Sequence, residues 1–417
     1  MVIYLDNNAT TKVDEQVFEE MLPYLKDEYA NPSSMYEFSV KSSNAIADAR
    51  EQMRDFFGAK SEREVIFTSC GSESANMAIK GAVAHNKSKK HIITTKVEHP
   101  CVLNTYKTLE KQGYKVDYIG VNSNGELDIE ELKEKINEDT ALVSVMWANN
   151  ETGVIFPVRE IGEIVKSKNP NTLFFVDAVQ GAGKVDISVE DSNIDMMGVS
   201  GHKFHAPKGI GALYIKSNVI LPPLITGGHQ ERGYRAGTEN VPYIVGMGKA
   251  ATLAKEGLEH ENTEVKRLRD KLETGILKAT FNSRLNSSIS NRVPNTTNIG
   301  FEYIEGELIL LHLSDLGICA SSGSACTSGS LEPSHVLRAM GTPFTSLHGS
   351  IRFSLSRFTT EKEIDYVLEK LPKVIEDITR ISPYQDELEH LRKSRGKCSG
   401  GVCNKSNCNK GKCCESD

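Results

Sequence analysis

A lysine directly after a short apolar segment is the first residue that suggests chemistry. Ser200-Gly-His-Lys203 follows the predicted strand at 194–199. Ligands of open α/β sheets bind at the carboxyl ends of strands, so such a lysine lies at the mouth of the sheet. If it is partly desolvated, its amine can lose a proton and form a Schiff base with an aldehyde cofactor. For this motif alone, the alternative is an ordinary surface lysine.

An acid at the end of a second apolar segment indicates which cofactor this is. Asp177 ends Leu173-Phe-Phe-Val-Asp177, and burial of a carboxylate there costs free energy unless it meets a cation or a donor. Pyridoxal phosphate needs such a partner, because a carboxylate keeps its ring nitrogen protonated and makes the ring an electron sink. Gln180 is placed to donate to the ring oxygen of that cofactor. The alternative for Asp177 is the N-cap of a helix.

A turn of small residues suits the cofactor phosphate. Ser69-Cys-Gly-Ser-Glu73 separates a predicted strand at 64–69 from a helical pattern at 72–84. Small residues at a helix N-terminus expose backbone N–H groups, and the helix dipole favours an anion there.

These residues require an α/β scaffold, which the hydrophobic pattern predicts. Most of the predicted strands are continuous apolar segments, as in a parallel sheet covered on both faces. They lie at 64–69, 91–95, 115–119, 141–147, 172–176, 194–199 and 211–215, with helices at 72–84 and 101–112. A charged helical stretch at 249–278 leads to strands near 297–301 and 348–353 and helices near 305–313 and 361–378.

We therefore predict a large α/β domain with a mainly parallel sheet and a smaller α/β C-terminal domain. The predicted boundaries are 1–14 for an N-terminal arm, 15–255 for the large cofactor-binding domain, 256–383 for the small domain and 384–417 for a tail. A helix could continue over 386–393. From Ser394 onward the polar composition predicts disorder.

Composition narrows the class of protein. Of the 417 residues, 39% are hydrophobic and 25% are charged, which is ordinary for a soluble globular protein. We find no apolar run of membrane-spanning length and no secretion signal, so we expect a cytoplasmic protein without membrane contact. The net charge of −7 argues against nucleic acid as the main partner.

The C-terminal tail has a composition of its own. Residues 392–417 hold seven basic and two acidic residues, which leaves a net charge of −12 on the rest of the chain. The tail thiols are Cys398, Cys403, Cys408, Cys413 and Cys414. Because a reducing cytoplasm disfavours disulfides, we consider a soft-metal site, a sulfur relay, or a solvated tail without function.

Nine motifs between Tyr4 and about Leu371 together resemble the cysteine desulfurases of the NifS/IscS type. This resemblance implies the class V aminotransferase family and fold type I of the pyridoxal-phosphate enzymes. The motifs are Tyr4-Leu-Asp-Asn-Asn-Ala-Thr-Thr11, Asn31-Pro-Ser-Ser34, Glu98-His99, Ala148-Asn-Asn-Glu-Thr-Gly153, Val176-Asp-Ala-Val-Gln180, Ser200-Gly-His-Lys203, Glu231-Arg-Gly-Tyr-Arg-Ala-Gly-Thr238, Ser321-Ser-Gly-Ser-Ala-Cys326 and Ile351-Arg-Phe-Ser354.

The resemblance implies a role for each matching residue. Lys203 would bind the cofactor covalently and later move the substrate's α-proton. Asp177 would pair with the ring nitrogen and Gln180 with the ring oxygen, while His99 would stack on the ring and transfer protons. The phosphate would be bound by Gly71, Ser72, Ser200 and His202, and by Thr238 of the other subunit of a homodimer.

The same resemblance implies L-cysteine as the substrate. Asn150 and Arg352 would hold its carboxylate, which the planar fork of arginine matches; the alternative for Arg352 is a structural ion pair. Cys326 lies in a Gly- and Ser-rich segment, so we expect an exposed, reactive thiol. It would take the substrate sulfur as a persulfide, leave alanine, and pass the sulfur to an acceptor such as an iron–sulfur scaffold protein.

The other body cysteines are interpreted as packing residues. Cys101 and Cys319 are expected in the core. Cys70 stands where the family has Gly and is expected to be a small filler near the phosphate, with a second reactive thiol as the alternative. Ser72 replaces a common Thr but keeps the hydroxyl, so phosphate binding should survive.

Other functions fit parts of this pattern. A selenocysteine lyase or a cysteine-sulfinate-type enzyme could use the same scaffold, and an ordinary aminotransferase would not need Cys326. A sulfur or metal carrier could act through the tail. The intact set of Lys203, Asp177, Arg352 and Cys326 argues against an inactive protein.

Overall fold

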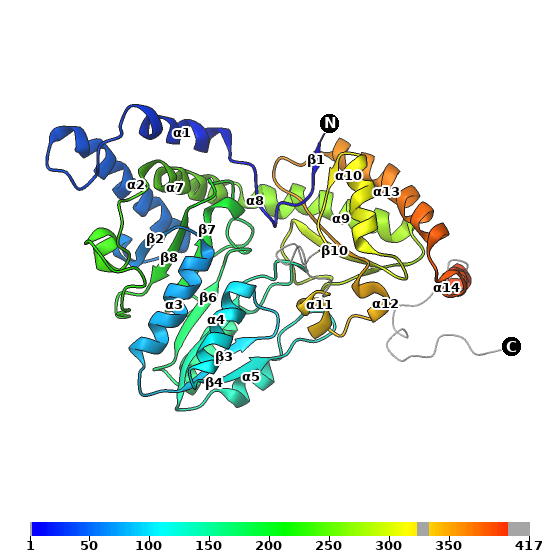
Figure 1. The fold of residues 1–417 in the computed structure, drawn as a ribbon, viewed down its shortest axis with the longest axis horizontal. Coiled ribbons are helices and arrows are strands. Elements are labelled where there is room, and N and C mark those ends of the chain that lie inside the picture. Colours follow the sequence, from blue (N-terminus) through cyan, green and yellow to red (C-terminus); the bar gives the residue numbers. More distant parts are fainter. Residues whose placement is uncertain (1, 323–332, 399–417) are drawn as a thin grey trace.

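A seven-stranded sheet organises the larger of two units in the computed structural model, which describes residues 2–322 and 333–398 (Figure 1). Its strands are β2 (Val65–Thr68), β3 (His91–Thr95), β4 (Lys115–Ile119), β5 (Thr140–Met146), β6 (Leu173–Asp177), β7 (Met196–Ser200) and β8 (Gly211–Ile215). Their order is β2-β8-β7-β6-β5-β3-β4. The strands from β7 to β4 are parallel to one another, and β8 is antiparallel to both neighbours, so the predicted mainly parallel sheet is confirmed.

Helices cover both faces of this sheet, which explains why its strands are apolar throughout. Ile66 and Phe175 pack under α3 (Gly71–His85) and α4 (Pro100–Lys111). Phe67 and Val176 point to the opposite face. That face is covered by α1 (Glu15–Lys26), α2 (Val40–Phe57), α5 (Ile129–Lys135), α6 (Val158–Lys168) and α7 (Val241–Glu256).

The smaller unit has a separate core around an antiparallel sheet. The sheet order is β12 (Ser350–Ser354), β10 (Thr296–Phe301) and β9 (Ser283–Leu285). Residues of α9 (Lys266–Ala279), α10 (Gly306–Asp315) and α13 (Glu361–Ile381) complete its core. The short helices α11 (His335–Ala339) and α12 (Phe344–Leu347) follow in sequence, and their buried residues Val336, Leu337 and Leu347 join the core of the larger unit. The fold class is as predicted, while the exact domain boundaries stay a prediction.

The predicted helical stretch at 249–278 is divided. It consists of the end of α7, the short α8 (Leu258–His260), a π-helical turn over Glu261–Val265, and α9. The chain therefore passes between the two units through a series of short helical segments instead of one straight helix.

The N-terminal segment also joins the two units. β1 (Ile3–Tyr4) pairs in parallel with β11 (Ile318–Cys319), and Leu5 is buried in the core of the smaller unit. The chain then crosses to α1, which lies over the larger unit (Figure 1). Residues 6–14 are thus the crossing segment.

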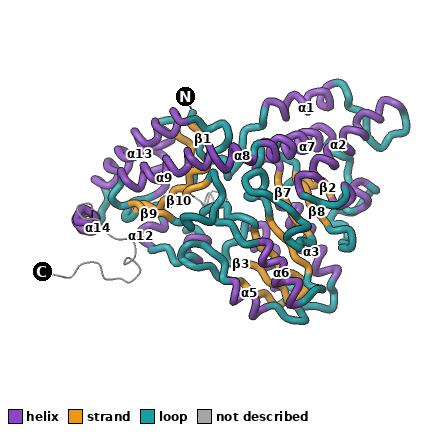
Figure 2. The backbone as a smooth tube through the Cα atoms, turned by 180° about the vertical axis from the view of Figure 1, so that it is seen from behind, coloured by secondary structure: helices purple, strands orange, loops and turns teal. Residues whose placement is uncertain are grey.

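The C-terminal helix extends further than the sequence predicts. α14 (Gln385–Cys398) lies at the outer end of the smaller unit (Figure 2). Leu388 is buried, and the guanidinium of Arg392 lies 4.6 Å from the centre of the Phe281 ring. These contacts anchor the helix, so the expected disorder from Ser394 is wrong for residues 394–398. Residues 399–417 lie outside the described part of the chain.

His205 binds the crossing segment to the larger unit through two hydrogen bonds. Its backbone has a φ of 72°, its N–H donates to Thr11 Oγ1, and its Nδ1–H donates to the carbonyl oxygen of Lys12. Burial, with a contribution from Arg357, lowers the pKa of His205 to about 4. Between about pH 4 and 6.5 the folded chain therefore keeps this ring neutral, whereas the unfolded chain protonates it.

We expect His205→Asn to weaken the loss of stability in acid, because asparagine tolerates a positive φ but does not titrate. From pH 6.5 to 5 the unmodified protein should lose about 2 kcal/mol more of its free energy of unfolding than the variant. Urea unfolding of both proteins at the two pH values measures this difference. Equal losses would show that His205 is not held neutral.

Candidate active site

A cavity of about 390 Å³ opens where β5, β6 and β7 end, beside the N-terminus of α3. This is the place where open α/β sheets bind ligands. It brings together most of the residues that the sequence singles out. Lining it are Lys203, Asp177, Gln180, His99, Gly71, Ser72, Ser200, His202, Asn150 and Arg352.

Lys203 lies on the wall of this cavity, in a short helical turn after β7. Its Nζ donates to the carbonyl oxygens of Asn8, at 2.6 Å, and Ala9, at 2.8 Å. The amine is therefore held inside the site by two main-chain acceptors, and the surface-lysine alternative is wrong.

Asp177 is buried at the end of β6. Its Oδ1 accepts the N–H of Val179 at 3.0 Å. A turn follows β6, so the helix N-cap alternative does not apply. Burial raises the pKa of Asp177, and the nearby His99 opposes this rise. A carboxylate in this position gains most from a cationic partner, which a protonated pyridine nitrogen provides.

The side-chain amide of Gln180 can form further hydrogen bonds. Its Nε2 donates to the carbonyl oxygen of Asn8 at 3.0 Å, which leaves one hydrogen on that nitrogen. Its Oε1 is buried and has no partner within residues 2–322 and 333–398. Because buried polar atoms are normally paired, this side chain indicates a polar ligand in the cavity.

The N-terminus of α3 offers a binding site for an anion that is built from uncharged groups. Its N-cap, Cys70, makes no side-chain hydrogen bond to the helix, so the first N–H groups are not capped by that side chain. A Cβ on Gly71 would come within 2.9 Å of Val179 Cγ2, so glycine allows this close approach. Burial lowers the pKa of His202 to about 4, with Lys203 adding to the effect, so the ring is neutral near pH 7.

His99 is the N-cap of α4. Its Nδ1 accepts the N–H of Cys101 at 3.2 Å and lies 3.0 Å from the Cys101 Sγ. The Cys101 thiol is only partly buried and lines the cavity, so the expected core position is wrong. Proline starts α4 at residue 100, which is the usual place for proline in a helix. Cys319 is also only partly buried, in the two-stranded pair β1–β11.

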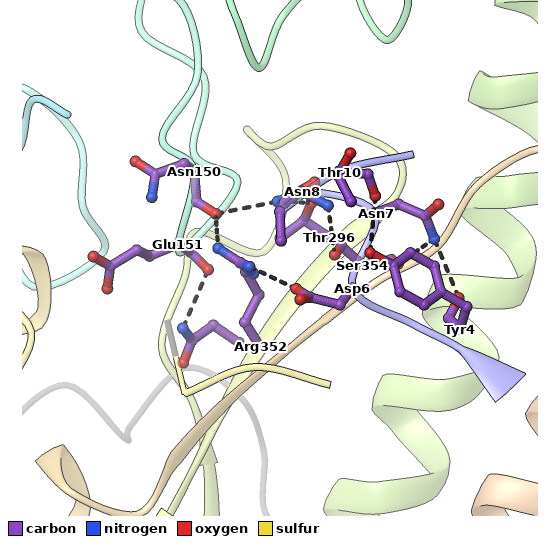
Figure 3. Close-up of polar contacts among 12 residues, drawn as sticks. Tyr4, Asp6, Asn7, Asn8, Thr10, Asn150, Glu151, Thr296, Arg352 and Ser354 are labelled. Atoms are coloured by element: carbon purple, nitrogen blue, oxygen red, sulfur yellow. Dashed lines mark hydrogen bonds and ion pairs between the residues drawn. The ribbon is translucent and has the colours of Figure 1, made fainter. Parts of the chain in front are cut away.

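Arg352 is both structural and available to a ligand. From β12 its Nη1 donates to the main-chain oxygen of Asn150 at 2.9 Å, and its Nη2 pairs with Asp6 at 2.7 Å (Figure 3). Its buried Nε has no partner among the described residues. The ion pair that was the alternative interpretation exists, yet it fixes the guanidinium at the cavity wall, where further N–H groups remain.

Asn8 is the residue that sequence reasoning missed. Its Nδ2 donates to Asn150 O at 3.2 Å and to Thr296 Oγ1 at 2.9 Å, and its main-chain N–H donates to Ser354 Oγ (Figure 3). Its carbonyl oxygen also accepts from Lys203 and Gln180. The motif Tyr4 to Thr11 is part of the resemblance, but its side chains alone gave no reason to assign Asn8 a role.

Some predicted positions are not in this cavity. Thr238 is exposed and does not line it. Cys326 lies outside the described residues, as do Cys403, Cys408, Cys413 and Cys414 and the side chain of Cys398. Within the described residues, no group of three or more His, Cys, Asp or Glu side chains could hold a metal ion.

Comparison with known proteins identifies the family. Residues 3–367 match the Aminotransferase class-V family. The chain belongs to this family. It is 57% identical over 386 residues to "Cysteine desulfurase" of Nostoc sp. (strain PCC 7120). The aligned region covers 93% of this chain and 96% of that protein.

Solved structures agree with this assignment. The structure of a "NIFS-LIKE PROTEIN" is 41% identical, with a TM-score of 0.85, over 90% of this chain and 100% of the other. The structure of "SspA in complex with cysteine" is 38% identical, with a TM-score of 0.76, over 86% of this chain and 100% of the other. These findings confirm the predicted fold.

Enzymes of this family depend on pyridoxal 5′-phosphate, which confirms the predicted cofactor. The residues fit it. Lys203 supplies an amine for the aldehyde, Asp177 a carboxylate for the ring nitrogen, and Gln180 unpaired polar atoms inside the same cavity. The N-terminus of α3 supplies N–H groups for the phosphate.

We expect Asp177→Asn to weaken cofactor binding by about 10- to 100-fold, since it removes the charge that a buried pyridinium requires. Titration of cofactor-free protein with pyridoxal 5′-phosphate, followed by absorbance, measures the affinity. Asp186→Asn is the control, because it removes an equal charge from an exposed carboxylate outside the cavity. Equal affinities for the two variants would exclude the assigned role of Asp177.

Proposed function

We propose that this protein is a pyridoxal-phosphate-dependent cysteine desulfurase, which converts L-cysteine to L-alanine and carries the sulfur as a persulfide on Cys326. The observation that supports this most is the single cavity in which Lys203, Asp177 and Arg352 converge. The activity named for the Nostoc relative and the complex of SspA with cysteine support the choice of substrate.

Arg352 and Asn150 set the orientation of the substrate. With Asp6 holding Nη2 and Asn150 O holding Nη1, the remaining N–H groups of the guanidinium can bind the carboxylate of L-cysteine. A substrate anchored there would lie in the same cavity as the Nζ of Lys203. When bound, the cofactor supplies an electron sink for negative charge at the substrate's α-carbon.

Lys203 and His99 are the proton carriers. Lys203 must release its proton and leave the carbonyl oxygens of Asn8 and Ala9 before it reacts, and it later takes the α-proton at Nζ. Burial lowers the pKa of His99, so the ring is neutral near pH 7 and carries one N–H, which can donate to a reacting group in the cavity.

Cys326 is the sulfur acceptor. Its thiolate attacks the substrate sulfur, the bond between that sulfur and the substrate's β-carbon breaks, and the electron pair of this bond stays with the β-carbon. Protonation of that carbon gives L-alanine, and the sulfur remains on Cys326 as a persulfide. The step needs no external oxidant, because the sulfur is oxidised while the carbon is reduced. A Gly- and Ser-rich sequence around Cys326 suits a thiol that must reach an acceptor protein.

Incubation of the purified protein with L-cysteine and a thiol reductant tests the proposal. Alanine and sulfide should appear in equal amounts. Pyruvate would indicate a β-lyase, and the absence of all three products would favour a carrier. A strong preference for L-selenocysteine in parallel reactions would indicate a lyase on the same scaffold.

We expect Cys326→Ala to abolish sulfur transfer but not cofactor binding. The variant should bind pyridoxal 5′-phosphate and change its absorbance with L-cysteine, yet release no sulfide and carry no persulfide by mass spectrometry. Cys319→Ala, which removes a thiol outside the cavity, should behave like the unmodified protein. A persulfide on Cys70 would refute the assignment to Cys326.

A homodimer is the second part of the proposal. Large apolar side chains are exposed at the start of the larger unit, on α1, on the segment before α2 and at the first residue of α2: Phe18, Leu22, Leu25, Tyr29, Met35, Tyr36, Phe38 and Val40. This region lies at one extremity of the molecule (Figure 1). A patch of this kind normally meets a partner. Thr238 is exposed and thus accessible to a second subunit.

We expect sedimentation velocity to give twice the mass of one chain. Tyr29 and Phe38, whose rings contact each other edge to face, are 76% and 44% exposed, so the double variant Tyr29→Glu/Phe38→Glu should weaken the dimer by at least 10-fold. Ile289→Glu changes an apolar residue of the smaller unit that is 82% exposed, and it should not weaken the dimer. A monomeric unmodified protein would refute the dimer.

The cellular setting follows from the thiols. Cys70, Cys101 and Cys319 are all free, which suits the reducing cytoplasm. None of the described helices is long and apolar enough to cross a membrane. We infer a cytoplasmic enzyme that passes sulfur to an acceptor protein, such as an iron–sulfur scaffold.

A further inference from the structure

The ring of His99 receives two hydrogen bonds from one residue. The N–H of Cys101 donates to Nδ1 at 3.2 Å, so Nδ1 must carry a lone pair and no proton. The Sγ of Cys101 lies 3.0 Å from the same Nδ1. Since Nδ1 is unprotonated, the thiol must be the donor in this second contact, as S–H···N.

The surroundings of Cys101 keep its thiol protonated. Burial raises the pKa of Cys101 strongly, and Asp177 adds to this rise, with smaller effects of the same sign from Glu98 and Cys70. The hydroxyl of Ser72, on α3, donates a hydrogen bond to the sulfur, which partly opposes this rise in the pKa. Cys101 therefore connects the phosphate end of the cavity with His99, and its raised pKa keeps the thiol a hydrogen-bond donor near neutral pH.

The charged groups that face His99 do not favour a second proton on its ring. Burial lowers the pKa of His99, Lys203 and His335 lower it further, and Asp177 raises it. A proton on Nδ1 would in addition break both contacts with Cys101 and leave the first turn of α4 without its cap.

We propose that Cys101 is a positioning residue, whose thiol reinforces the contact of its main-chain N–H with Nδ1 and so strengthens the preference of His99 for the tautomer that carries its proton on Nε2. The role rests on the proposed function, in which His99 exchanges protons in the cavity. With Nδ1 held against the N-terminus of α4, the Nε2 edge lies on the opposite side of the ring. The thiol thus adds to the main-chain N–H in holding the ring in this orientation, with its remaining N–H on Nε2.

The test compares Cys101→Ala with Cys101→Ser in cofactor-free protein, where no activity is needed. Diethylpyrocarbonate modifies neutral imidazole, so the pH dependence of modification of the His99 peptide, measured by mass spectrometry, gives the midpoint of its titration. Loss of the thiol in Cys101→Ala should raise this midpoint by about half a unit to one unit, the effect of one hydrogen bond. Cys101→Ser keeps a donor and should stay within about 0.2 units of the unmodified protein.

Cys319→Ala is the matched control, as it removes a partly buried thiol outside the cavity and should not move the midpoint. In the loaded enzyme, the acid limb of kcat should move by the same amount in Cys101→Ala, with KM for L-cysteine nearly unchanged. An unchanged midpoint in Cys101→Ala would overturn the proposal, and so would equal shifts in the alanine and serine variants, which indicate packing alone. A protein without desulfurase activity would fail the proposed function but still show the shift.

Discussion

The geometry of the site depends on the position of one main-chain carbonyl group, that of Asn8. It accepts hydrogen bonds from Lys203 and Gln180 in the larger unit. The side chain of the same residue binds Thr296 of the smaller unit. A buried polar group that loses its partner costs about 1–3 kcal/mol. The crossing segment must therefore occupy one position, and this position sets the reactive amine relative to the strands that carry Arg352.

Two acids near the site are buried where water cannot stabilise them, Glu98 and Glu151. Burial raises the pKa of Glu98 to about 8, and Asp177 beside it adds to the rise. The pKa of Glu151 is also raised by burial, although Ser334, His335 and Arg352 oppose this. A cation or a hydrogen-bond donor that enters the cavity relieves part of this cost. A cofactor that binds only the folded chain should for this reason stabilise it as well as supply chemistry.

The sequence predicted what depends on local pattern. β3, β4 and β8 have the predicted bounds, and β8 is a short apolar segment between turns. α1 and α2 were missed because exposed apolar residues such as Leu25 and Val40 blur their helical periodicity. Cys101 was misassigned because its environment depends on how α4 meets the sheet. Asn8 was missed because a main-chain carbonyl, which every residue has, carries its role.

Arg352 shows why structural and functional interpretations of one residue need not compete. A guanidinium has five N–H groups in a fixed plane, so an ion pair and a main-chain contact use only part of its capacity. Asp6 and Asn150 hold one side, and this removes the freedom that would otherwise be lost on substrate binding. The same reasoning applies to His99, which caps α4 with one nitrogen. In both residues the structural contact prepares the group for its chemistry.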